Sequence, residues 1–174
     1  MDPTPKTASR LRPSFRNTEA GLIGEIGMLR FENQQDFLEI DLAEQESADL
    51  PSKEDAYLTV RVSSSGFSGH NDLWVLAPAL CSFCQGLVTL ERDRRGEAVL
   101  EAVLPKELRI VVRSIDSSGH MLVEGSTGYQ VQRELSSPWH SVAFGIEFDP
   151  SQLVRAVAVD WVRANAEPRT KSQG

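Results

Sequence analysis

Hydrophobic and polar residues alternate along several short stretches of the chain, a pattern typical of half-buried β-strands. Leu38, Ile40 and Leu42 alternate with Phe37, Glu39 and Asp41, and the same period recurs over residues 57–63. This alternation predicts strands at 36–42, 57–63, 98–104 and 142–148. A short strand is also expected at His70 to Leu76, and the β-branched residues of 108–115 predict another, with a return strand through Met121 and Val123. Tyr129 to Arg133 is a candidate strand.

Two further stretches have helical spacing. After Pro78, the residues Leu80, Phe83, Leu87 and Leu90 fall on one face of a helix that ends near Asp93. A second helix is expected after Asp149, which is the expected N-cap. Pro150 would take the first helical position, Gln152 has the spacing of a capping box, and Leu153, Val157, Trp161 and Ala164 would form one apolar face.

The order of these elements predicts the fold class. Strands that follow one another through tight turns form antiparallel sheets, and helices cover an apolar sheet face. We therefore expect an α+β domain over residues 28–165, with a single antiparallel sheet of about six to eight strands and two amphipathic helices packed on one face. The proline-containing basic residues 1–22 are expected to be a disordered leader, and residues 166–174 a flexible tail.

The charge is distributed unevenly. The 174 residues carry a formal net charge of −7, and segment 32–55 alone holds nine acidic residues against one lysine. This acidic balance argues against a nucleic-acid-binding protein, since the phosphate backbone attracts positive surface. Two interpretations of the segment stay open. It is a solvated edge strand and loop, or it is a recognition surface for a basic protein partner. On the second interpretation the candidate partner-binding residues are Glu39, Asp41, Glu44, Glu46, Asp49, Glu54 and Asp55.

Two motifs have the composition of cofactor or metal sites. Cys81 and Cys84 form one C-x-x-C pair, whereas a zinc site needs four ligands, and Cys84 falls on the apolar stripe of the first helix. Gly66-Phe67-Ser68-Gly69 lacks the lysine and the following helix of a phosphate-binding loop, and is typical of a turn between two strands. We expect no cofactor and no metal.

One pair of residues has the composition of a catalytic site. His70 and Asp72 lie two positions apart in a predicted strand and so share one face, where the carboxylate could orient the imidazole. No nucleophile motif such as G-x-S-x-G accompanies them. The sequence therefore predicts no catalytic residue and a protein that is not an enzyme.

No apolar run approaches the length of a membrane span, and the first 20 residues lack the apolar core of a secretory signal. These observations predict a cytoplasmic protein that does not contact the membrane, with its cysteines reduced.

Several stretches resemble a known family. They are Asp55 to Val62, Gly66 to Gly69, the Leu80/Phe83/Leu87 helix, Gly96 to Leu100, Leu108 to Val112, Gly119-His120, Trp139, Phe144 to Asp149 and the Leu153 helix. Over roughly residues 28–165 the chain resembles the bacterial immunity proteins of the WapI type and a related uncharacterised actinobacterial family. The resemblance implies a cytoplasmic antitoxin that binds and blocks a toxin domain of a polymorphic or contact-dependent system without performing chemistry.

The sequence leaves three functional hypotheses open. The first is the immunity protein, whose acidic segment would steer a basic toxin domain. The second is an acidic secretion or assembly chaperone, or a bacterial domain of other binding function. The third is an enzyme that uses His70 and Asp72.

Overall fold

The alternating stretches form two four-stranded antiparallel sheets. The computed structural model describes residues 27–45 and 55–167, without the side chains of 44 and 45. The first sheet contains β1 (Met28–Asn33), β2 (Asp36–Gln45), β3 (Ala56–Ser64) and β4 (Phe67–Val75) in that order. The second contains β5 (Glu97–Glu101), β6 (Leu108–Ser114), β7 (Met121–Gln130) and β8 (Trp139–Phe148), also in chain order.

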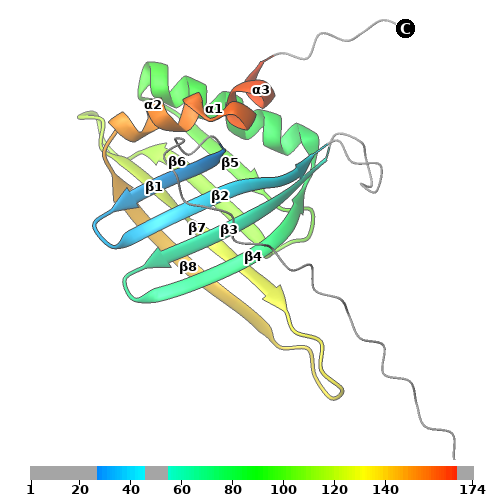
Figure 1. The fold of residues 1–174 in the computed structure, drawn as a ribbon. Coiled ribbons are helices and arrows are strands. Elements are labelled where there is room, and N and C mark those ends of the chain that lie inside the picture. The colour runs from blue at the N-terminus through cyan, green and yellow to red at the C-terminus, as the bar shows by residue number, and fades with distance from the viewer. Residues whose placement is uncertain (1–26, 46–54, 168–174) are drawn as a thin grey trace, which may run out of the picture.

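The two sheets pack face to face with their strands crossing, as Figure 1 shows. The rings of Phe31 and Phe148 meet between β1 and β8, with centroids 4.5 Å apart. At the other side, β4 passes so close over the second sheet that a Cβ on Gly69 would lie 3.3 Å from a methyl group of Val142. The arrangement is a two-sheet sandwich with crossed strands, one of the two common ways of packing sheets.

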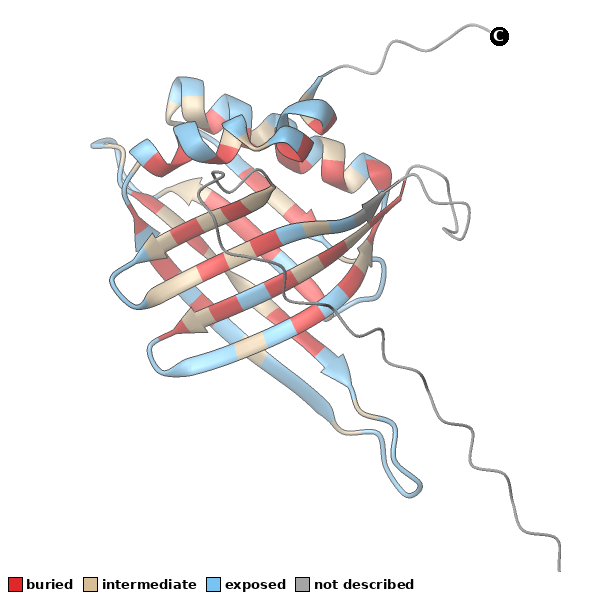
Figure 2. Ribbon diagram, in the orientation of Figure 1, coloured by how far each residue is buried: buried red, intermediate tan, exposed pale blue. Residues whose placement is uncertain are grey.

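The core lies between the sheets and is built from alternate residues of every strand. Figure 2 shows buried and exposed positions alternating along the strands. Ile40 and Val60 of the first sheet and Ile110 and Val123 of the second are completely buried. The predicted antiparallel α+β class is therefore confirmed, but the expectation of a single sheet is wrong. The alternation of hydrophobic and polar residues shows that one face of each strand is buried. It does not show whether helices or a second sheet bury that face.

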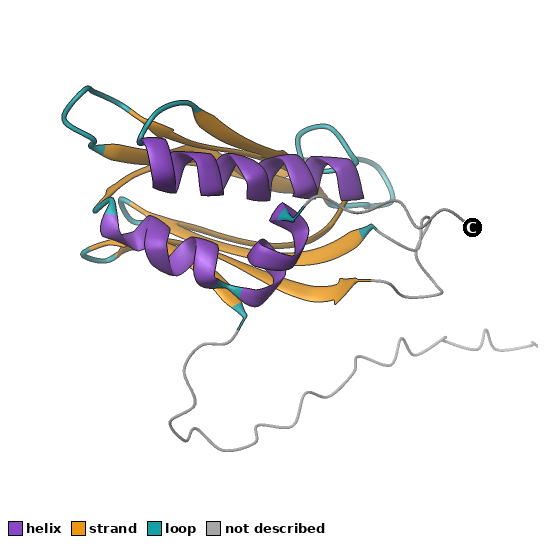
Figure 3. Ribbon diagram, turned by 90° about the horizontal axis from the view of Figure 1, so that it is seen from above, coloured by secondary structure: helices purple, strands orange, loops and turns teal. Residues whose placement is uncertain are grey.

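The helices gather at one end of the sandwich instead of covering a sheet face (Figures 1 and 3). They are α1 (Ala77–Asp93), α2 (Ser151–Ala158) and α3 (Asp160–Ala166). The second predicted helix is thus two short helices, because Val159 has an extended conformation with φ −60° and ψ 129°. None of the helices in the described residues is long and apolar enough to cross a membrane.

The predicted start of the second helix is confirmed only in part. The Asp149 carboxylate accepts a hydrogen bond from the Ser151 backbone N–H at 2.8 Å. Asp149 is not the N-cap, because Pro150 already has helical backbone angles and takes that position. Gln152 does not complete a capping box, because its side chain reaches across to β1 and bonds to the backbone of Glu32.

Most predicted strands are present, with altered ends. The strand expected at 98–104 ends at Glu101, and the chain then leaves the second sheet so that Val103 N–H donates to the Trp74 carbonyl of β4 at 2.9 Å. The candidate strand at Tyr129 to Arg133 belongs to β7, which ends at Gln130. Strand β1 was not predicted. The leader predicted at 1–22 lies outside the described residues, as does most of the tail predicted at 166–174, whose first residue, Ala166, is the last residue of α3.

Candidate binding surface

The outer face of the first sheet is formed by the residues of β1 to β4 that point away from the core. Strand register places Arg30, Glu39, Arg61 and His70 in one row across the four strands. A second row contains Met28, Asp41, Thr59 and Asp72. The helices lie at the end of the sheet and leave this face open (Figures 1 and 3).

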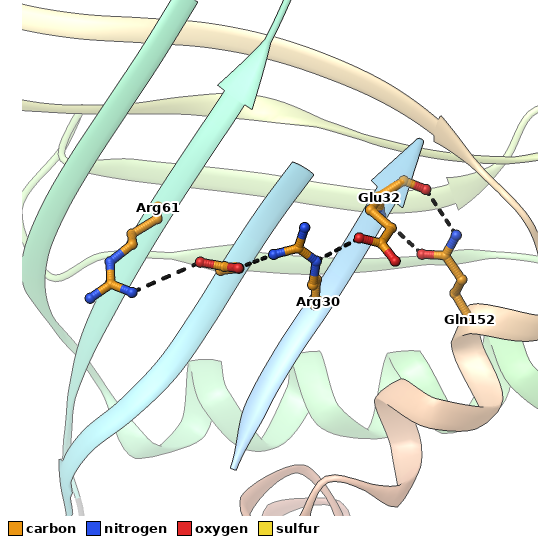
Figure 4. Close-up of polar contacts among 5 residues, drawn as sticks. Arg30, Glu32, Arg61 and Gln152 are labelled. Carbon is orange, nitrogen blue, oxygen red and sulfur yellow. Dashed lines mark hydrogen bonds and ion pairs between the residues drawn. The ribbon is translucent and has the colours of Figure 1, made fainter. Parts of the chain in front are cut away.

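An ion-pair network joins the first three strands of this face. The Arg30 guanidinium bonds to the Glu39 carboxylate and, at 2.7 Å, to Glu32. Arg61 approaches the other oxygen of Glu39 at 3.9 Å. Figure 4 shows the line of contacts from Arg61 to Gln152. Exposed pairs of this kind contribute about 0–1 kcal/mol each to stability, so their main effect is to hold the side chains in fixed positions.

The network leaves the outer face acidic. Asp41 is exposed, and Asp72 keeps 43% of its side chain in solvent while it accepts a hydrogen bond from Thr59 at 2.7 Å. The charged residues on this face of the described strands are the acids Glu32, Glu39, Asp41 and Asp72 and the bases Arg30 and Arg61. The acids outnumber the bases, and the two carboxylates that neither arginine contacts, Asp41 and Asp72, lie on β2 and β4.

The predicted partner-binding residues are not one surface. Asp41 is exposed on the outer face, as expected of a steering charge. Glu39 lies beside it, but two arginines neutralise it and only 13% of its side chain is exposed. The side chain of Glu44 and all of Glu46, Asp49 and Glu54 lie outside the described residues.

Asp55 has a structural position, and its prediction as an exposed steering charge is wrong. It is 4% exposed, and its carboxylate accepts a hydrogen bond from the Ala77 backbone N–H at 3.0 Å. Ala77 begins α1, whose N-cap residue Leu76 has no side chain able to cap. Asp55, at the start of β3, therefore satisfies a free N–H group at the helix N-terminus, where a negative charge is also favourable. Sequence reasoning missed this role because 22 residues separate the two partners.

His70 and Asp72 share the outer face, as the two-residue period predicted. The imidazole Nε2 lies 3.5 Å from the carboxylate, and the side chains are 57% and 43% exposed. The two side chains lie next to each other at the β4 edge of the outer face, where solvent reaches both groups.

The cysteine pair has a structural position in which the Cys84 thiol is unreactive. Cys84 is completely buried in the apolar face of α1, and burial, with a smaller effect from Cys81, raises its pKa to about 12. A thiol with this pKa is a poor nucleophile and metal ligand at neutral pH. Within residues 27–45 and 55–167, no group of three or more His, Cys, Asp or Glu side chains could hold a metal ion.

The three tryptophans differ in exposure. Trp161 is buried, and its indole N–H donates to the Gly27 carbonyl at 2.6 Å. Trp74 is half-buried on the outer face of the first sheet, where its ring contacts that of Tyr57 with centroids 4.5 Å apart. Trp139, at the start of β8, remains 38% exposed.

A cleft of about 900 Å³ follows the outer edge of β1. Met28, Arg30 and Glu32 line one side, and the other side is lined by Arg155, Ala156, Ala158, Val159 and Asp160. Strand β1 pairs only with β2 among the described strands, so this edge is free of a neighbouring strand. At one end the Gln152 amide closes it, donating to the Glu32 carbonyl and accepting from the Glu32 N–H, both at 2.9 Å.

Comparison with known proteins finds no match: no family model, no curated protein and no solved structure is similar to this chain. The resemblance to the WapI-type immunity proteins is therefore a prediction from the sequence alone.

Proposed function

We propose that this protein is a non-enzymatic immunity protein that binds a basic toxin domain of a polymorphic or contact-dependent toxin system and blocks it by occlusion. The observation that carries the proposal is the open, acidic outer face of the first sheet. A rigid face with excess carboxylates attracts a positively charged partner and raises the rate of association. The family resemblance supports the choice of a toxin as that partner.

The mechanism needs only fixed charges. Domains that bind nucleic acid carry basic surfaces, so a toxin domain that cleaves nucleic acid would also carry a basic surface. Asp41 and Asp72 lie in one row of the outer face. Their carboxylates would occupy the positions on the basic toxin surface that nucleic-acid phosphates otherwise occupy. The ion pairs of Arg30 and Arg61 with Glu39 hold the neighbouring side chains still, which lowers the entropy lost on binding.

Binding to the purified toxin domain encoded beside the gene for this protein tests the proposal. We expect binding that weakens with salt, and a slower association rate for Asp41→Lys and Asp72→Lys. The matched control is Glu97→Lys, which makes the same charge change at an exposed position of β5, in the other sheet. If the chain does not bind the domain at low salt, or if Glu97→Lys weakens binding as much as Asp41→Lys, the proposal is wrong.

A further inference from the structure

The hairpin of β7 and β8 extends beyond the sandwich as an arm, which we define as residues 129–140. Figure 1 shows it projecting past β4, at the end of the molecule opposite the helices. Figure 2 shows that most of its length is exposed. The arm carries the most exposed large hydrophobic residue of the described chain, Leu135, which is 99% exposed at its tip.

The arm displays two aromatic rings on the side that faces the first sheet. Along β7, Tyr129 has the same orientation as the buried Thr127, and along β8, His140 has the same orientation as Val142. The rings of Tyr129 and His140 stack with centroids 5.9 Å apart. Strand β4 covers Val142 and Thr127 at Gly69, but two residues further along the arm the Tyr129 side chain is 47% exposed.

The arm is held in place without a partner. At its base the Asn71 side chain of β4 donates to the Gly128 carbonyl at 2.7 Å. Towards the tip, Val131 N–H donates to the Pro138 carbonyl at 3.0 Å and Arg133 N–H to the Ser136 carbonyl at 2.9 Å. An exposed apolar group on an ordered scaffold loses little conformational entropy when it is buried in an interface.

The stacked rings continue the outer face of the first sheet. The outer face of the first sheet and the inner face of the second sheet point in the same direction. Beyond the edge of β4 the first sheet no longer covers the second. The exposed surface therefore continues at a lower level, from Asp72 and His70 on β4 to Tyr129 and His140 on the arm. A protein that docks on the acidic face meets this step. Aromatic rings surrounded by polar groups are typical of the residues that dominate binding energy.

We infer that the arm is the apolar part of the binding site, with Tyr129 and Leu135 inserted against a hydrophobic surface of the same basic partner. This inference rests on the proposed function and adds a second class of contact to it. The charges of the outer face would govern the association rate, and the apolar contacts of the arm would govern dissociation.

Binding of the toxin domain by Tyr129→Ala and Leu135→Ala tests the inference. We expect each variant to bind about 10- to 30-fold more weakly, through faster dissociation and with an unchanged dependence on salt. Val154→Ala is the matched control, because it shortens a 51% exposed apolar side chain on α2, away from the arm. Since Leu135 is almost fully exposed, its substitution leaves folding intact, which circular dichroism checks.

The outcomes separate the two proposals. If both arm variants bind as the unchanged chain does while Asp41→Lys weakens binding, the inference about the arm is wrong and the proposed function stands. If Val154→Ala weakens binding equally, the arm has no special role and the inference is also wrong. If the unchanged chain does not bind the domain, the proposed function fails, and the inference fails with it.

Discussion

The first strands of the two sheets, β1 and β5, occupy equivalent positions but have their edges covered differently. In each half of the chain a four-stranded antiparallel meander is followed by helix, and each first strand is packed against a helix. Helix α1 lies against β5 so closely that a Cβ on Gly86 would be 2.8 Å from the Cβ of Ala98. Helix α2 contacts β1 through the polar side chain of Gln152 and leaves a cleft beside it.

The difference shows that one topology allows two ways to protect an edge strand. A strand edge with free backbone groups invites pairing with another chain, and proteins cover it with helices, loops or charges. At β5 the covering helix packs through an apolar face, since Leu80, Phe83 and Leu87 of α1 are all completely buried. At β1 the cover is local, and two hydrogen bonds of the Gln152 amide tie α2 to the strand. The two edges should therefore respond differently to substitution.

The largest effect is expected from removing the apolar cover of the second sheet. Phe83→Ala deletes a completely buried ring of α1 and should lower the free energy of unfolding by about 3–5 kcal/mol, because a cavity replaces packed atoms. Urea denaturation measures the loss. Val88→Ala, at an exposed position of the same helix, is the control and should change stability by less than about 0.5 kcal/mol. A similar loss in both variants would show that α1 does not seal β5 as described.

Removing the polar cover of the first sheet should cost less. Gln152→Ala leaves the N–H and carbonyl of Glu32 without their partner, which should destabilise the fold by about 1–3 kcal/mol. Hydrogen exchange of the Glu32 amide reports the event directly and should become faster. Gln85→Ala removes an exposed glutamine from α1 and serves as the control. Unchanged protection of the Glu32 amide in Gln152→Ala would contradict this account of the edge.

Removing the contact between the start of β3 and the N-terminus of α1 should have a smaller effect on stability. Asp55→Ala removes the carboxylate that accepts from the Ala77 N–H, and losses of helix capping cost about 0.5–2 kcal/mol. Thermal or urea unfolding measures it. Asp55→Asn keeps an acceptor oxygen and should lose less. If Asp55→Ala unfolds like the unchanged chain but binds the partner more weakly, Asp55 is a steering charge after all.

The smallest effect belongs to the turn between β6 and β7 of the second sheet. A hydrogen bond with the Asp116 carboxylate raises the pKa of His120 above 6.5, and the same contact lowers the pKa of Asp116 below 3.8. A raised histidine pKa adds stability that is complete below pH 6.5 and disappears as the pH rises through the raised pKa. Both groups are solvent-exposed, so the gain is small. An NMR titration should place the His120 midpoint above 6.5, and Asp116→Asn should return it towards 6.5.

Several features of the fold followed from local patterns in the chain. The two-residue period placed β2, β3 and β8, and the stripe from Leu80 to Leu90 placed α1, because both periods record which side chains are buried. The same period placed His70 and Asp72 on one face. Strand β1 was missed although Leu29 and Phe31 alternate within it, because the stretch is only six residues long.

The binding surface was harder to predict because the position of an acidic residue in the sequence does not show which side chains or backbone groups it contacts in the fold. Nine acidic residues of segment 32–55 looked equivalent along the chain. The structure separates them, since Glu39 is paired with arginines from β1 and β3, Asp55 caps α1 and Asp41 is exposed. These differences depend on strand register and on contacts between distant residues, which a local pattern does not record.

The sequence by itself determined that the domain is antiparallel α+β, which residues form the buried faces of β2 and β3 and the stripe from Leu80 to Leu90, and that its acidic charge is concentrated before residue 56. Only the tertiary structure decided that two sheets cover each other, that the helices occupy one end, and that an arm carries Tyr129 and Leu135 beyond the sandwich. The physical reason is that burial is recorded locally as periodicity, whereas the identity of the covering element depends on long-range packing. An apolar strand face can be buried equally well by a helix or by another sheet.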